Sequence, residues 1–160
     1  MKDLTITTVI KVYQLDELSP EDQNLITQAK EMCKKSYVPY SKFAVGAAAL
    51  LNNGVVVKGS NQENAAYPSG TCAERTTIFY ANSEYPDQAV KTLAVAAFNK
   101  GSYLEKPIPP CGACRQVLLE TEKRYNQHMR ILLYGEKEIY EFRGGIKDLL
   151  PLSFDAAAMD

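Results

Sequence analysis

The chain has 160 residues, with 18 Lys plus Arg against 19 Asp plus Glu and a formal net charge of -1. This length suits a single domain, which we expect over residues 1–160. The chain has no excess of positive charge, which argues against a nucleic-acid partner. The longest apolar run, residues 44–51, is less than half of what a bilayer requires, so we expect no membrane partner. Asp3 and nearby threonines interrupt any signal-like segment, which favours a cytoplasmic location.

The first half of the chain predicts an extended segment, a helix and a hairpin. Residues 4–13 are rich in β-branched side chains, which favours an extended segment or an added strand. Ser19, followed by proline and two acids, is a helix start, and the apolar spacing predicts a helix to about Ser36. Residues 43–58 hold two apolar runs joined by Asn-Asn-Gly, which predicts a hairpin.

The second half of the chain alternates helices with strands. A helix is expected to begin at Cys72, and the continuous apolar run at residues 91–98 is typical of a central strand covered on both faces. A second helix is expected over residues 111–125, two short strands over residues 130–142, and a helical turn at residues 146–150. This order predicts an α/β fold, a three-layer α/β/α sandwich around a mixed sheet of roughly five strands.

One histidine and four cysteines narrow the chemistry. A single histidine excludes every site that needs two, and in a reducing compartment cysteine spacing points to metal binding or catalysis. Cys72, Cys111 and Cys114 stand at two expected helix starts, where free N–H groups and partial positive charge favour thiolates. Three thiolates plus a position for water is the ligand count of a catalytic zinc. Cys33 falls on an apolar helix face, where a thiol usually packs as a small hydrophobe.

Three neighbours of these cysteines suit zinc hydrolysis. Glu74, two residues beyond Cys72, is placed to act on a zinc-activated water as general base rather than as a ligand. Three thiolates on Zn²⁺ carry a net negative charge, which Arg75 and Arg115 could offset by donating to the sulfurs. Each arginine could also be an ordinary solvated surface residue.

Two other interpretations stay open at this point. Cys33 or His128 could complete a structural zinc site, and Cys111 with Cys114 could form a redox-active pair. Glu74 would have no role in either, which favours the catalytic interpretation. His128 lies in a polar segment and is expected to be an exposed residue at a helix end.

Two motifs, T-C-A-E-R-T at residues 71–76 and P-C-G-A-C-R-Q at residues 110–116, resemble the zinc motifs of the small homotetrameric cytidine deaminases. The resemblance extends to Y-S-K-F-A-V-G-A-A at residues 40–48, N-Q-E-N-A-A-Y at 61–67 and L-L-P-L-S-F at 149–154. It covers roughly residues 20–154 and leaves residues 1–18 outside as an N-terminal extended segment.

The resemblance implies one Zn²⁺ per chain on the three cysteines and hydrolytic deamination of cytidine and deoxycytidine in pyrimidine salvage. Glu74 would take the proton of the attacking water and pass it to N3 of cytosine and then to the departing amine. Asn61 and Glu63 would hold the ribose hydroxyls of a small-molecule nucleoside. Phe43 would pack against this substrate, and the Ala73 N–H would donate to the base carbonyl.

The resemblance also implies a homotetramer, in which Phe154 lies over the site of a neighbouring subunit. Two departures from the family pattern bear on the site. Residues 100–106 form an insertion that could alter the pocket rim, and Asp155-Ala156 replaces the usual Gly-Pro after Phe154. The alternatives are a deaminase of a modified cytosine nucleoside of the blasticidin type and a non-catalytic, zinc-stabilised module.

Overall fold

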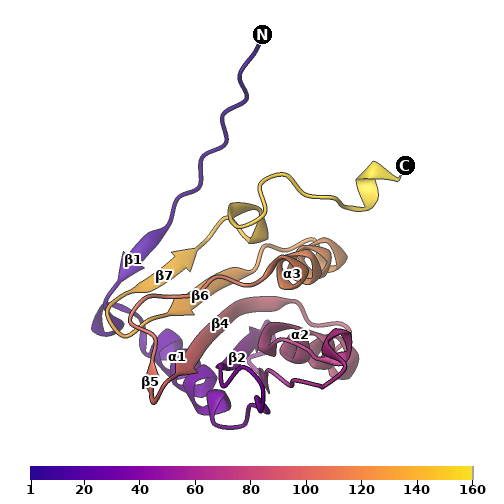
Figure 1. Cartoon of the computed structure of the whole chain (residues 1–160). Coiled ribbons are helices and arrows are strands. Elements are labelled where there is room, and N and C mark those ends of the chain that lie inside the picture. Colours follow the sequence, from indigo (N-terminus) through magenta and orange to yellow (C-terminus); the bar gives the residue numbers. More distant parts are fainter. Residues whose placement is uncertain (160) are drawn as a thin grey trace.

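The computed structural model describes residues 1–159 and is organised around one mixed sheet of seven strands (Figure 1). The strands are β1 (Lys11–Tyr13), β2 (Ala44–Leu51), β3 (Val56–Ser60), β4 (Val90–Asn99), β5 (Ser102–Tyr103), β6 (Arg130–Tyr134) and β7 (Ile139–Phe142). Their order is β1-β7-β6-β4-β2-β3, with β5 paired to β4. β4 and β6 run parallel, and the other pairs run antiparallel.

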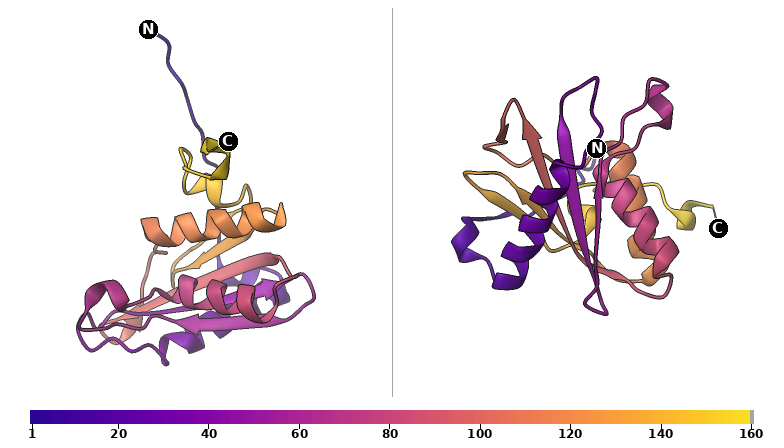
Figure 2. Two further views of the ribbon diagram at one scale, coloured as in Figure 1. Left: turned by 90° about the vertical axis from the view of Figure 1, so that its right-hand side faces the viewer. Right: turned by 90° about the horizontal axis from the view of Figure 1, so that it is seen from below.

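Helices cover both faces of this sheet. The helices are α1 (Pro20–Cys33), α2 (Ala73–Glu84) and α3 (Gly112–Tyr125), with 3-10 turns at Leu15–Glu17, Tyr67–Ser69, Ile146–Asp148 and Ala156–Ala158. α1 lies on one face, and α2 and α3 lie on the other (Figure 2). The predicted three-layer α/β/α sandwich is therefore confirmed. Within residues 1–159 no helix combines the length and apolar character needed to cross a membrane.

The expected count of roughly five strands was too low. β1 occupies only the last part of the predicted extended segment, where it pairs with β7 from Lys11↔Glu141 to Tyr13↔Ile139. β5 lies in the 100–106 insertion and folds back on β4 after a turn with Lys100 and Gly101 at positive φ. Strands of two or three residues are too short to show a hydrophobic period, so sequence patterning cannot reveal them.

Apolar side chains of the central strands alternate between the two faces. In β4, Leu93 and Val95 pack on the side of α2 and α3, whereas Ala94 and Ala96 pack on the side of α1. β4 lies between β2 and β6, and these side chains are at most 2% exposed. The prediction of a central strand covered on both faces is confirmed, and the same burial explains the unbroken apolar run.

Helix α1 begins as predicted and ends earlier than predicted. The Ser19 side chain caps it by accepting from the backbone N–H of Asp22. The helix stops at Cys33 rather than Ser36. The N–H groups of Lys34, Lys35 and Ser36 bond to carbonyls three residues earlier. The Ser36 hydroxyl donates to the carbonyl of Val45 in β2 at 3.0 Å. Cys33 is buried and its thiol donates to the Ala96 carbonyl at 3.3 Å, so it is a core thiol, as expected.

A charge cluster joins α1 to the edge of the sheet. The Arg130 guanidinium donates to both carboxylate oxygens of Asp22, at 2.6 and 2.9 Å, and to Glu141. Glu141 also accepts from the Tyr13 hydroxyl at 3.0 Å and from Arg143. Burial acts to raise the pKa of Asp22, but hydrogen bonds from Arg130 and Ser19 outweigh it and lower that pKa below its ordinary value. The cluster thus holds α1, β6, β7 and β1 together through ionised carboxylates.

The 100–106 insertion is attached to α1 through Tyr103. The Tyr103 hydroxyl donates to the Lys30 carbonyl at 3.1 Å, and the Lys30 ammonium lies 4.5 Å from the centre of the Tyr103 ring. The Tyr103 ring also meets Phe98 and Tyr134 edge to face. Through these contacts the insertion packs between the end of β4 and α1.

Candidate active site

Three cysteine sulfurs meet where α2 and α3 begin. Cys72 is the N-cap residue of α2, Cys111 is the N-cap residue of α3, and Cys114 lies in the first turn of α3. The Sγ atoms of Cys72 and Cys111 are 3.8 Å apart, and those of Cys111 and Cys114 are 3.5 Å apart. All three sulfurs lie within 4.8 Å of one another. The two helix starts therefore converge on a single cluster, as the sequence predicted.

The spacing of the sulfurs fits zinc. A tetrahedral Zn²⁺ with Zn–S bonds of about 2.3 Å places its sulfur ligands about 3.8 Å apart. Within residues 1–159 these three sulfurs form the one group of His, Cys, Asp or Glu ligand atoms that lie close enough together to hold a metal ion. Cys33 bonds to a core carbonyl, and the His128 side chain is 67% exposed with its Nδ1 atom 3.4 Å from Glu122. Neither supplies a fourth ligand here, so the cluster has the ligand count of an open, catalytic zinc site.

The guanidinium group of Arg75 lies next to the sulfur cluster. Its Nη2 atom lies 3.7 Å from the sulfur of Cys72. A hydrogen bond from Cys114 lowers the pKa of Cys72 to about 5, and Arg75 and Cys111 contribute further to this shift. The thiolate that metal binding requires is therefore favoured at Cys72.

Arg115 makes different contacts from those expected of it. Its Nε atom donates to the Pro110 carbonyl at 2.8 Å, and its Nη1 atom donates to the Leu149 carbonyl at 2.5 Å. The guanidinium is thus bonded to backbone carbonyls rather than to a sulfur. Arg115 ties the loop before Cys111 to the segment that follows the 3-10 turn Ile146–Asp148.

Glu74 lies beside the sulfur cluster and is largely buried. It is the second residue of α2 and is 5% exposed. Burial raises the pKa of Glu74, and Cys114 is within hydrogen-bonding reach of its carboxyl group. A carboxyl group whose pKa is shifted towards neutrality can both accept and return a proton. The preceding residue, Ala73, is fully buried, and its N–H belongs to the helix start, where backbone donors lack intrahelical partners.

Strand β3 sets the position of this helix start. A Cβ atom added to Gly59 would lie 2.6 Å from the Thr77 hydroxyl oxygen and 2.8 Å from the Thr77 backbone nitrogen. The Thr77 hydroxyl in turn donates to the Ala73 carbonyl at 2.8 Å. Only glycine at position 59 lets the first turns of α2 lie this close to the sheet, so Gly59 helps to place Cys72 and Glu74.

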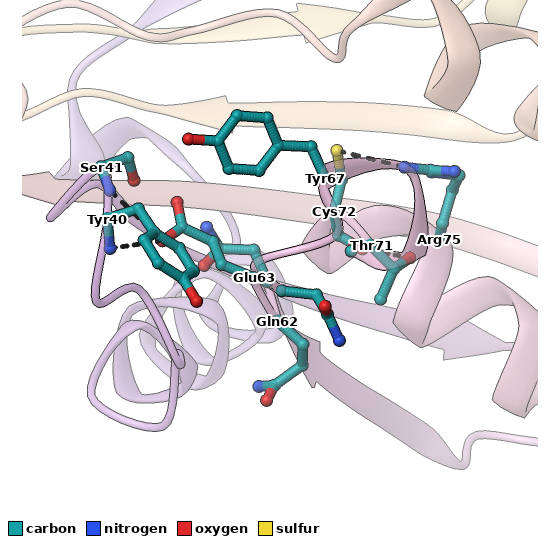
Figure 3. Close-up of a pocket in the computed structure, with 11 residues that line it drawn as sticks. Tyr40, Ser41, Gln62, Glu63, Tyr67, Thr71, Cys72 and Arg75 are labelled. Atoms are coloured by element: carbon teal, nitrogen blue, oxygen red, sulfur yellow. Dashed lines mark hydrogen bonds between the residues drawn. The ribbon is translucent and has the colours of Figure 1, made fainter.

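A pocket of about 530 Å³ opens beside Cys72 (Figure 3). Its walls are formed by Tyr40, Ser41, Asn61, Gln62, Glu63, Asn64, Tyr67, Gly70, Thr71, Cys72 and Arg75. This volume lies within the range of about 300–1,000 Å³ that is usual for small-molecule sites. The pocket combines two tyrosine rings with amide and carboxylate groups and leads to the candidate metal cluster.

The polar groups of the pocket are held in place by backbone. Asn61 accepts from the Val45 N–H at 2.8 Å and donates to the Phe43 carbonyl at 2.9 Å. Glu63 accepts from the N–H groups of Tyr40 and Ser41 at 3.0 and 3.3 Å (Figure 3). The Ser41 hydroxyl and these N–H groups lower the pKa of Glu63. Glu63 is therefore an ionised acceptor, suited to hydroxyl donors.

Some pocket residues were not anticipated, and some expected residues lie elsewhere. No sequence pattern assigns a role to Tyr40 or Ser41, although both belong to the same motif as Phe43. In the described chain Phe43 is half-buried against the core rather than part of the pocket wall. Phe154 is 63% exposed near α3, where its carbonyl accepts from Gln116 at 2.9 Å.

Three cysteine sulfurs at paired helix starts, a buried carboxyl group and an adjacent pocket define a zinc-binding hydrolase. Residues 19–128 match the family described as the cytidine and deoxycytidylate deaminase zinc-binding region. The chain belongs to this family and is an enzyme of the cytidine deaminase class.

Named relatives and solved structures agree with this assignment. A cytidine deaminase of Halalkalibacterium halodurans is 49% identical over 98 residues, which are 61% of this chain and 70% of that protein. The crystal structure of cytidine deaminase from Burkholderia pseudomallei is similar with a TM-score of 0.69 at 37% identity, covering 82% of this chain and 97% of that one. For the Mycobacterium tuberculosis cytidine deaminase structure the TM-score is 0.67 at 35% identity, covering 86% and 99%.

Proposed function

We propose that the chain deaminates cytidine and deoxycytidine to uridine and deoxyuridine, with release of ammonia, as a cytoplasmic enzyme of pyrimidine salvage. The observation that carries this proposal is the burial of Glu74 in the first turn of α2, beside the three-sulfur cluster. A structural zinc or a redox pair would not need a buried acid there. Relatives named as cytidine deaminases support the choice of nucleoside.

The proposed chemistry divides between the metal and Glu74. Zn²⁺ bound by Cys72, Cys111 and Cys114 would supply the Lewis acidity that makes water a nucleophile at neutral pH. Glu74 takes one proton from the water that adds to C4 of the cytosine ring and delivers it to N3. It then carries the remaining hydroxyl proton to the exocyclic nitrogen, so that the C4–N4 bond breaks and ammonia leaves.

Substrate orientation in this proposal comes from three parts of the chain. Asn61 retains one amide hydrogen beyond its bond to Phe43, and Glu63 is an ionised acceptor, so both suit ribose hydroxyls. The Ala73 N–H at the start of α2 suits the base carbonyl. The ring of Phe43, whose carbonyl holds Asn61, would contact the nucleoside after a local adjustment of its side chain.

We also propose that the enzyme is a homotetramer in which Phe154 reaches a neighbouring site. Phe154 is exposed and displaced from the pocket of its own chain, which is the arrangement that such a role requires. Phe79 and Tyr80 on the outer face of α2 are each more than half exposed. Exposed aromatic side chains of this kind are typical of self-association surfaces.

The test is a spectrophotometric deamination assay of the full chain with cytidine and deoxycytidine, run beside a zinc-to-protein measurement. We expect turnover of both nucleosides and about one zinc per chain. Turnover of a blasticidin-type nucleoside but not of cytidine would favour the related antibiotic deaminase. Bound zinc with no turnover of any of the three would instead indicate a non-catalytic module.

A further inference from the structure

The N-terminal arm, residues 1–10, leaves the body of the molecule as an extended chain (Figures 1 and 2). Pairing of β1 with β7 begins at Lys11, opposite Glu141, and β7 ends one residue further on at Phe142, after which the chain turns through Gly145 at positive φ. The Thr8 hydroxyl donates to the Asp148 carbonyl at 3.0 Å and tethers the middle of the arm. The arm is thus a continuation of an edge strand beyond the end of its neighbour.

The arm has the side-chain pattern of a half-buried strand. Leu4, Ile6, Ile10 and Val12 share one face at period two, yet they are 79%, 47%, 45% and 54% exposed. On the same side, Thr8 and Ile10 line a hollow of about 370 Å³ whose walls include Phe142 and Leu149. Exposed β-branched residues at a free sheet edge are a template for pairing with another strand.

We propose that the arm pairs antiparallel with the arm of a second copy of this chain. Opposite charges on the arm favour a second copy as the partner and set the register. When Asp3 of one copy faces Lys11 of the other, Leu4 faces Ile10. Thr7 then lies on the twofold axis, opposite Thr7 of the second copy. Leu4, Ile6, Ile10 and Val12 then lie on one face, with Val9 on the other, and the first face continues the hollow beside Phe142. A contact of this kind joins two sheets edge to edge through β1.

Cysteine cross-linking tests the register directly. Antiparallel partners lie about 4.5–5.5 Å apart between Cα atoms, which a disulfide can span. In the full chain, Thr7→Cys should link to the partner's residue 7 at least about tenfold faster than Thr5→Cys, whose mate would lie about 14 Å away. Peptide mapping separates this link from links to the native cysteines, and the result does not depend on whether the proposed homotetramer forms.

Charge reversal supplies the matched control. Asp3→Lys and Lys11→Asp alone should each slow linking of Thr7→Cys by about threefold or more, and the double variant should restore it. Equal linking of Thr5→Cys and Thr7→Cys, or no linking, would overturn the proposal in favour of an arm that stays on its own chain. Single reversals without effect would equally overturn the proposed register.

Discussion

Replacing Gly59 by alanine is expected to slow deamination although position 59 lies outside the pocket wall. Ordinary van der Waals contact begins at about 3.4 Å. The new methyl group would be closer than this by about 0.8 Å to the Thr77 hydroxyl oxygen and by about 0.6 Å to the Thr77 backbone nitrogen. Because the second clash is with helix backbone, α2 must move away from β3. Cys72 and Glu74 would move with it, while the cysteines of α3 stay in place.

A displacement of this size is large for an active site. We expect kcat for cytidine to fall by roughly 10- to 100-fold and the free energy of unfolding by about 1–3 kcal/mol. Thr77→Ala should rescue Gly59→Ala only in part, because it removes the hydroxyl clash and leaves the clash with the Thr77 nitrogen. The assays are steady-state kinetics and urea unfolding of the zinc-loaded enzyme.

Gly112→Ala is the matched control, since this glycine begins α3 and an added Cβ there has no neighbour within 4 Å. It should leave kcat and stability close to those of the parent. The reasoning is refuted if Gly59→Ala matches the parent in both assays, or if Gly112→Ala loses as much activity as Gly59→Ala.

Three further substitutions test single contacts of the fold and the pocket. Asp22→Asn should lower the free energy of unfolding at pH 7 by about 1–3 kcal/mol and flatten its dependence on acid pH. The Asp22 carboxylate has a lowered pKa in the folded state, so it stabilises the fold at pH values above its ordinary pKa of 3.8. This stabilisation is lost as the pH falls through the pKa of the folded state. Urea unfolding from about pH 2 to 7 measures it, because the loss lies mainly below the ordinary pKa. An unchanged acid limb would argue against the Arg130 pairing. Tyr103→Ala should lower the free energy of unfolding by about 1–3 kcal/mol, because it removes the contacts between the insertion and Lys30, and it should leave kcat unchanged. A drop in kcat would show that the insertion reaches the pocket. Glu63→Gln should raise KM for cytidine about tenfold or more while Zn²⁺ content stays constant, and an unaltered KM would remove Glu63 from substrate binding.

Local signals explain why much of the fold and the metal cluster could be predicted. The serine cap, the Asn-Gly turn and the unbroken apolar run of β4 are each decided within about ten residues of chain. Cysteines at two strand-to-helix junctions converge because helices on one face of a sheet begin at the same edge. Glu74 is placed by its spacing from Cys72 on a single helix turn.

Features that depend on distant partners could not be predicted in this way. Arg115 bonds to the Leu149 carbonyl, 34 residues away, and nothing near Arg115 in the sequence indicates that partner. The lowered pKa of Glu63 comes from the Ser41 hydroxyl and from the N–H groups of Tyr40 and Ser41, more than 20 residues earlier. The strands β1 and β5 exist only because a neighbouring strand offers a free edge, so their formation is a tertiary effect.

The most direct test of the central claim compares Glu74→Gln with the parent for cytidine turnover and bound zinc. The account predicts that Glu74→Gln keeps about one zinc per chain and a normal unfolding midpoint, while turnover falls by about 10³-fold or more. Glu84→Gln, the same change at an exposed acid that ends α2, should leave both quantities unaltered. Turnover that survives in Glu74→Gln, or zinc lost together with activity, would contradict a proton-carrying role for Glu74 beside a three-cysteine zinc site.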